Sequence, residues 1–239
     1  MVYGDWSRRW ITLAAFSGER CVDVDDRIDK VLKLWREDIP LPWQRPADPR
    51  LLAKRYGRTH HKHGVPKSGS EHEIEFEILG LDSHPIPSGR CFGHKIVDGV
   101  NAVPLARDAA GGRGGNVEGD LLLLAGSGGA HRAFLLEVKS TSNDAWYAVV
   151  ENLLQLRLFL ESTEARRIFQ NRAVAKDLPK RLPVTAGVLA PRAFYVAPKK
   201  KRNATAHARE LIDAMATELT GTPIELGLWE GGEIVRLEP

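Results

Sequence analysis

Residues 119–139 read GDLLLLAGSGGAHRAFLLEVK, and the rest of the 239-residue chain is organised around them. Two apolar runs, 121–124 and 133–136, flank a segment rich in glycine at 126–129. Turn glycines between two strand-like runs predict a hairpin of antiparallel strands. The centre of the chain is therefore expected to be a β-hairpin with apolar strands.

Three charged residues are expected at the open end of this hairpin. Antiparallel pairing brings Asp120, at the start of the first strand, beside Glu137 and Lys139, at the end of the second. Glu137 and Lys139 are two residues apart, so they lie on one face of their strand. Charges at the end of apolar strands are costly unless they are paired or bind something. These residues are therefore candidates for a functional site.

The composition is that of an ordinary globular protein, with 43% hydrophobic and 27% charged residues. The net charge of +3 neither requires nor excludes a nucleic-acid partner. The two cysteines form no CxxC pair, which fits a reducing compartment. No signal-like segment opens the chain, and no apolar run reaches the length of about 18 residues that a transmembrane helix needs. We expect a soluble, cytoplasmic protein without a membrane contact.

The N-terminal part of the chain has a helical pattern of its own. Residues 23–38 repeat apolar side chains at helical spacing and carry acids in the first turn. Three prolines within residues 40–46 then break any helix. This pattern predicts an N-terminal helical region over residues 1–65 and a main domain over residues 66–239.

Residues 70–79 carry two conflicting patterns. Glutamates at every second position favour a strand, whereas Ser70 and Glu73 form a capping box that is typical of a helix start. We favour the helix, which places Glu73 and Glu77 on neighbouring turns of one face. Either glutamate is then available to a site below the helix, although both also fit a solvated surface.

The segment after Lys139 predicts a long buried helix. Residues 140–143 supply N-cap candidates, and the pattern up to residue 161 is apolar on nearly all sides. Glu151 and Gln155 interrupt this helix four residues apart, on one face. Polar residues on a buried face either bond to the core or face an active site.

The rest of the chain predicts further elements of an α/β domain. The expected elements are helices over 164–175 and 203–219, a buried strand over 184–190, and a closing hairpin of 224–229 with 233–237.

Asp120, sixteen intervening residues and then Glu137-x-Lys139 resemble the motif of the PD-(D/E)xK nuclease superfamily. The resemblance covers residues 70–190. Gln155 and Phe159 are similar to the Q-xxx-Y motif of RecB-like members, with Phe in place of Tyr, and Gly119 stands where the motif has Pro. The resemblance implies a restriction-endonuclease-like fold, a mixed central β-sheet flanked by helices.

The resemblance also implies metal-dependent hydrolysis of phosphodiester bonds in nucleic acid, in DNA rather than RNA. A phosphodiester is anionic, so its hydrolysis needs a hard cation such as Mg²⁺ or Mn²⁺ with oxygen ligands. The implied ligands are Asp120, Glu137, the backbone carbonyl of Val138, and Glu73 or Glu77. Lys139 would orient or deprotonate the attacking water, or stabilise charge in the transition state, and Gln155 would position substrate or water.

Basic segments are candidate phosphate contacts, although each also fits a solvated loop. They lie in the basic loop over 58–67, in the glycine-rich segment 109–115 and in the run 199–202, and their candidate residues are Lys62, Arg113, Lys199, Lys200, Lys201 and Arg202. A homodimer, or a larger defence or repair complex, would fit such a nuclease. The alternative is a module of the same fold that has lost catalysis and binds nucleic acid or partners in such a complex.

Overall fold

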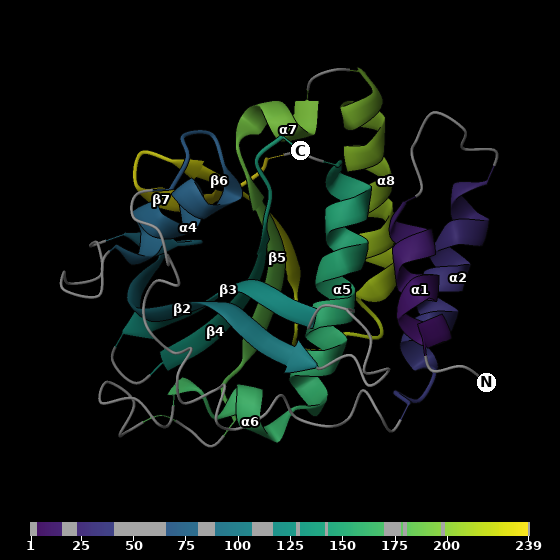
Figure 1. Cartoon of the computed structure of the whole chain (residues 1–239), viewed down its shortest axis with the longest axis horizontal. Helices are drawn as coiled ribbons and strands as arrows, with labels where there is room; N and C mark the ends of the chain where they lie inside the picture. Colours follow the sequence, from purple (N-terminus) through teal and green to yellow (C-terminus); the bar gives the residue numbers. More distant parts are fainter. Residues whose placement is uncertain are drawn as a thin grey trace.

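The structure is a computed structural model, and it describes residues 4–15, 23–40, 66–80, 89–106, 117–127, 130–141, 143–169, 178, 181–196 and 199–238. Its centre is a seven-stranded mixed sheet with helices on its two sides (Figure 1). The strands are β1 Arg90–Cys91, β2 His94–Ala106, β3 Val117–Ser127, β4 Ala130–Val138, β5 Val184–Ala190, β6 Ile224–Glu230 and β7 Glu233–Arg236. The helices are α1 Gly4–Ala14, α2 Val24–Arg36, α4 Glu71–Leu79, α5 Ala145–Glu161, α6 Thr163–Arg166, α7 Arg192–Val196 and α8 Lys199–Met215.

The strands pair in chain order, from β1 to β7. The β4–β5 and β5–β6 pairs are parallel, and the other neighbours in this order are antiparallel. A single parallel pair, Cys91 with Ile234, also joins β1 to β7 and closes the sheet on itself. The predicted α/β architecture with a mixed sheet is confirmed, and the closure is an additional feature.

The predicted hairpin is formed by β3 and β4. Leu121 pairs with Leu136 and Leu124 with Ala133. Alternate residues enter two separate cores: Leu122 packs on the side of α5, and Leu123 on the side of α4. The four leucines at 121–124 are thus buried on both faces of the sheet, which explains why they form a continuous apolar run.

The long helix after β4 is α5, and most of its side chains are buried. Its N-cap is Asp144, whose side chain accepts a hydrogen bond from the Tyr147 N–H, so the prediction of an N-cap among residues 140–143 was wrong by one position. Asn143 has a φ of 62°, in the left-handed region, whereas an N-cap residue takes an extended conformation. The chain therefore turns at Asn143 before the helix begins.

The N-terminal helices α1 and α2 belong to the same hydrophobic core as α5 and α8. In Figure 1 they lie on the far side of α5 and α8 from the sheet. The indole Nε1 of Trp146 on α5 donates a 2.8 Å hydrogen bond to the carbonyl of Leu13 at the end of α1. The helix predicted over 23–38 is confirmed as α2. The boundary predicted at residue 65 lies outside the described residues.

Two other predicted segments differ in their limits. The basic run 199–202, expected as a loop, forms the first turn of α8, which ends at Met215 and continues as a turn rather than as a helix to residue 219. In the segment predicted as a helix over 164–175, α6 ends at Arg166, and residues 170–177 lie outside the described part. The buried strand over 184–190 and the closing hairpin are confirmed as β5 and as β6 with β7. Within the described residues, no helix is long and apolar enough to span a membrane.

Candidate active site

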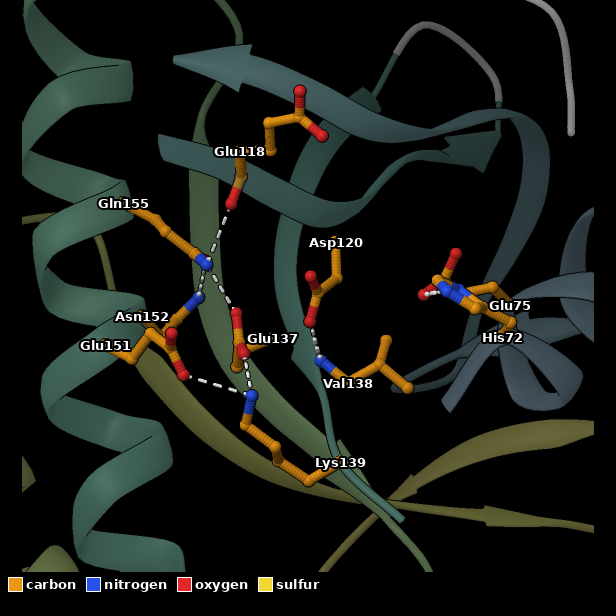
Figure 2. A network of polar contacts seen from close by, with 10 residues as sticks. All are labelled: His72, Glu75, Glu118, Asp120, Glu137, Val138, Lys139, Glu151, Asn152 and Gln155. Atoms are coloured by element: carbon orange, nitrogen blue, oxygen red, sulfur yellow. Dashed lines mark hydrogen bonds and ion pairs between the residues drawn. The ribbon is translucent and has the colours of Figure 1, made fainter. Parts of the chain in front are cut away.

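Asp120 and Glu137 each lie one residue beyond the pair Leu121–Leu136, which ends the β3–β4 ladder at the open end of the hairpin. The backbone N–H of Val138 donates a 2.9 Å hydrogen bond to Oδ2 of Asp120 (Figure 2). Glu137 is almost completely buried. The predicted meeting of Asp120 with the Glu137-x-Lys139 pair is confirmed.

Lys139 lies between two carboxylates. Its Nζ donates to Oε1 of Glu137 and forms an ion pair with Oε2 of Glu151 at 3.0 Å. Glu137 comes from β4, and Glu151 comes from the face of α5 that covers it (Figure 2). The lysine therefore links the strand that carries the motif to the helix that follows it.

Gln155 holds the other oxygen of Glu137. Its Nε2 donates to Oε2 of Glu137 and, over 3.1 Å, to the backbone carbonyl of Glu118 on β3. Asn152 donates through Nδ2 to the carbonyl of Leu135 at 3.3 Å and to Oε1 of Gln155 at 3.5 Å. The structure thus places Gln155 in the cluster, as predicted, and adds Asn152 behind it.

The carboxyl groups of this cluster are held in an unfavourable environment for negative charge. Burial raises the pKa of Glu137 well above its ordinary value, and the neighbouring charges of Asp120 and Glu151 raise it further, against the opposing effect of Lys139. Burial likewise raises the pKa of Asp120, opposed by Lys139 and the Val138 N–H. For Lys139, burial alone would lower the pKa, but the surrounding carboxylates outweigh it and raise the pKa. The surrounding carboxylates therefore favour the ammonium form of Lys139.

The acid of α4 whose charge interacts with this cluster is Glu75, which lies apart from it in Figure 2 and was not among the predicted site residues. Its carboxylate accepts a hydrogen bond from Nδ2 of Asn101 at 2.9 Å and contacts Nδ1 of His72 at 3.3 Å. Glu75 is 4% exposed, and burial raises its pKa to about 7; the Asn101 hydrogen bond opposes this shift, and the charge of Asp120 adds to it. Glu75 lies three and four residues before Ile78 and Leu79 and shares their buried side of α4, but apolar residues on other sides of this short helix hide that signal in the sequence.

Glu73 and Glu77 make other contacts. The Ser70 hydroxyl accepts from the Glu73 N–H at 3.3 Å, which is one half of the predicted capping box, but the Glu73 carboxylate accepts from the backbone N–H of Gly69 rather than from that of Ser70. The carboxylate of Glu77 accepts from Nε1 of Trp229 on β6. The helix prediction for this segment is confirmed, but the structure does not bring Glu73 or Glu77 to the cluster.

The predicted phosphate contacts are placed only in part. Lys62 and Arg113 lie outside the described residues, as do the side chains of Lys199, Lys200 and Lys201. Arg202 is exposed in the first turn of α8. Within the described part, none of these residues forms a contact with the acidic cluster.

The cluster suits a hard divalent cation by its chemistry and charge. Lys139 forms ion pairs with Glu137 and Glu151, and Asp120 lies close enough for its charge to act on them; buried or half-buried carboxylates in excess of cations favour protons or a metal ion. Carboxylate and backbone carbonyl oxygens are the ligands that Mg²⁺ and Mn²⁺ prefer. Within the described residues, no three His, Cys, Asp or Glu side chains are already arranged around one metal position. Asp120 and Glu137, with the carbonyl of Val138, are the groups that would hold the cation.

Comparisons of the chain with models of protein families, with curated proteins and with solved structures found no match.

Proposed function

We propose that this protein is a metal-dependent nuclease of the PD-(D/E)xK type, which hydrolyses phosphodiester bonds in DNA with Mg²⁺ or Mn²⁺. The observation that carries the proposal is the juxtaposition of Asp120, Glu137 and Lys139 at the end of the β3–β4 hairpin. The sequence motif consists of an aspartate and a Glu-x-Lys pair. In this structure the three side chains lie close together on one face of the sheet. A restriction-endonuclease-like fold belongs to the same proposal.

The surroundings of the three residues support a reactive role. Burial raises the pKa of both carboxyl groups, so negative charge is unfavourable in this cluster. The end of a hairpin does not need such residues for its structure. Gln155 and Val138 orient the oxygens of Glu137 and Asp120, respectively. Such fixed orientation of ligand oxygens by neighbouring donors is typical of metal sites.

The residues divide the chemistry among them. Asp120 and Glu137 would hold the cation, which neutralises charge on the phosphate and lowers the pKa of a bound water. Lys139 orients the attacking water and stabilises negative charge as it develops on the phosphorus oxygens. Gln155 keeps the Glu137 carboxylate in one orientation. The basic run 199–202 supplies contacts to the nucleic-acid backbone.

Cleavage of DNA by the purified protein tests the proposal. Linear and supercoiled duplex DNA, single-stranded DNA and RNA are incubated with the protein in Mg²⁺, in Mn²⁺ and in a chelator. We expect metal-dependent cleavage of DNA by the wild type and its loss in Lys139→Ala and Asp120→Ala. A matched control is Lys33→Ala, which removes an exposed lysine on α2 and should leave cleavage unchanged. Equal cleavage by the wild type and both site variants would contradict the proposal.

One observation favours the alternative, a nuclease-fold module that binds nucleic acid or partners without cleaving. In the described part of the chain, Lys139 is paired with Glu137 and Glu151, and the acids do not form a ready group of three metal ligands. Such a module would retain DNA in a salt-dependent manner and show no metal-stimulated cleavage. The same assay, run with DNA binding measured in parallel, separates the two functions.

A further inference from the structure

Glu151 is the least explained acid of the cluster. Its Oε2 atom is buried and accepts no hydrogen bond from a neutral group, and within the described residues its partner is the ammonium of Lys139 at 3.0 Å. The side chain itself is one-third exposed, so Glu151 could turn to solvent at little cost. It instead points to Lys139 (Figure 2).

The distance between the two polar residues of α5 matches the distance between the two charged residues of β4. Glu137 and Lys139 are two residues apart on a strand, which corresponds to about 6.7 Å along the chain. Glu151 and Gln155 are four residues apart on a helix, which corresponds to about 6 Å of rise. The helix therefore presents one polar group to each member of the strand pair, Gln155 to Glu137 and Glu151 to Lys139.

We propose that Glu151 is a positioning residue that supplies the counter-ion of Lys139 and keeps the ammonium beside the reaction centre when Glu137 binds a cation. This inference rests on the proposed function. A divalent cation at Glu137 would repel the ammonium and compete for the same carboxylate, and within the described residues Glu151 is the other acid that forms an ion pair with Lys139. Without Glu151, cation and lysine would exclude each other.

A double-mutant cycle in cation binding tests the inference. Mn²⁺ is titrated calorimetrically into the wild type, Glu151→Gln, Lys139→Met and the double variant. We expect Glu151→Gln to weaken Mn²⁺ binding about tenfold, because Lys139 then keeps Glu137 for itself, and we expect Lys139→Met to bind Mn²⁺ at least as tightly as the wild type. In the Lys139→Met background, the Glu151→Gln change should lower the Mn²⁺ affinity by less than about threefold. An equal loss in both backgrounds would overturn the inference, since Glu151 would then act on the cation directly.

A second readout needs neither metal nor activity. In ¹⁵N-lysine-labelled protein, the signal of a buried ammonium that is held by two carboxylates exchanges slowly with water, and its absence from Lys139→Met identifies it. We expect this signal to broaden or disappear in Glu151→Gln. A matched control is Glu161→Gln, which removes an exposed ion pair with Arg157 on the same helix and should leave the signal unchanged. An unchanged signal in Glu151→Gln would overturn the positioning role. If the wild type binds no Mn²⁺ but the ammonium signal is lost in Glu151→Gln, the proposed function is overturned and the contact between Glu151 and Lys139 is confirmed.

Discussion

The backbone N–H of Val138 donates a 2.9 Å hydrogen bond to Oδ2 of Asp120, so the strand that carries Glu137 and Lys139 also orients the aspartate of the neighbouring strand. Two replacements of Asp120 can therefore separate the loss of its charge from the loss of its hydrogen bond with the buried Val138 N–H. An amide at position 120 keeps an acceptor for the Val138 N–H, whereas a methyl group does not.

Asp120→Asn and Asp120→Ala should both abolish cleavage but differ in stability. We expect Asp120→Asn to be as stable as the wild type or more so at pH 8, because it removes the charge of a half-buried carboxyl group whose pKa is raised by loss of contact with water. Asp120→Ala leaves the buried Val138 N–H without its acceptor and should cost about 1–3 kcal/mol relative to Asp120→Asn. Urea denaturation of the three proteins measures the difference. Equal stability of the two variants would show that this hydrogen bond contributes nothing.

Gln155→Leu tests the residue that orients Glu137. The change removes the donors to Glu137 and to the Glu118 carbonyl without adding charge. We expect metal affinity or cleavage to fall by roughly 10–100-fold, as for other residues that orient metal ligands. Mn²⁺ titration and steady-state cleavage check this. Asn152→Ala, which removes a longer contact to the same side chain, should have a smaller effect.

The raised pKa of Glu75 should make the stability of the protein depend on pH. Its pKa in the folded protein, about 7, lies above the ordinary value of 4.5, so the folded state binds this proton more tightly than the unfolded state. The protonated Glu75 side chain contributes its full stabilisation below about pH 4.5. This contribution is lost as the pH rises through 7, which lowers the free energy of unfolding by up to about 3 kcal/mol. Glu75→Gln should therefore gain stability relative to the wild type between pH 5 and pH 8.

Denaturation at both pH values measures this gain, and Glu210→Gln, on the exposed face of α8, is the control. A stability difference between Glu75→Gln and the wild type that does not change with pH would contradict the assignment.

Trp10 tests whether the N-terminal helices fold together with the sheet. Its side chain is 1% exposed in the core shared by α1, α2, α5 and α8. Trp10→Ala should cost about 3–5 kcal/mol and shift the single unfolding transition of the whole protein. Fluorescence and circular dichroism should report coincident transitions. A separate early transition would show that residues 1–65 unfold on their own.

The start of α5 is a local test of the fold. Asp144→Ala removes the side chain that accepts from the Tyr147 N–H and should cost about 1 kcal/mol, whereas Ser140→Ala, at another position predicted as a cap, should cost much less. Chemical denaturation of both variants measures this. A larger cost for Ser140→Ala would place the cap elsewhere.

The features that could be predicted from the sequence are those with a local cause. The β3–β4 hairpin follows from apolar runs around glycines, and its register brings Asp120 to Glu137 without further information. The cap of α5 was missed by one position because five consecutive residues, 140–144, can all cap a helix, and the left-handed backbone of Asn143 selects the last of them. Closure of the sheet depends on the pairing of Cys91 with Ile234, which are far apart in sequence and give no local signal.

The choice between the acids of α4 also depends on tertiary contacts. Glu73, Glu75 and Glu77 alternate along one short helix that has apolar residues on more than one side, so its sequence does not define which face is buried. Packing of Ile78 and Leu79 into the core on the α4 side of the sheet turns Glu75 inward, toward Asn101. The same rotation leaves Glu77 beside Trp229.

Calorimetric titration of Mn²⁺ into the wild type and Asp120→Asn shows whether the acidic cluster is a metal site. We expect one binding event in the wild type and its loss in Asp120→Asn, with both proteins folded by circular dichroism. Binding of Mn²⁺ with the same affinity by both proteins, or by neither, would contradict this expectation.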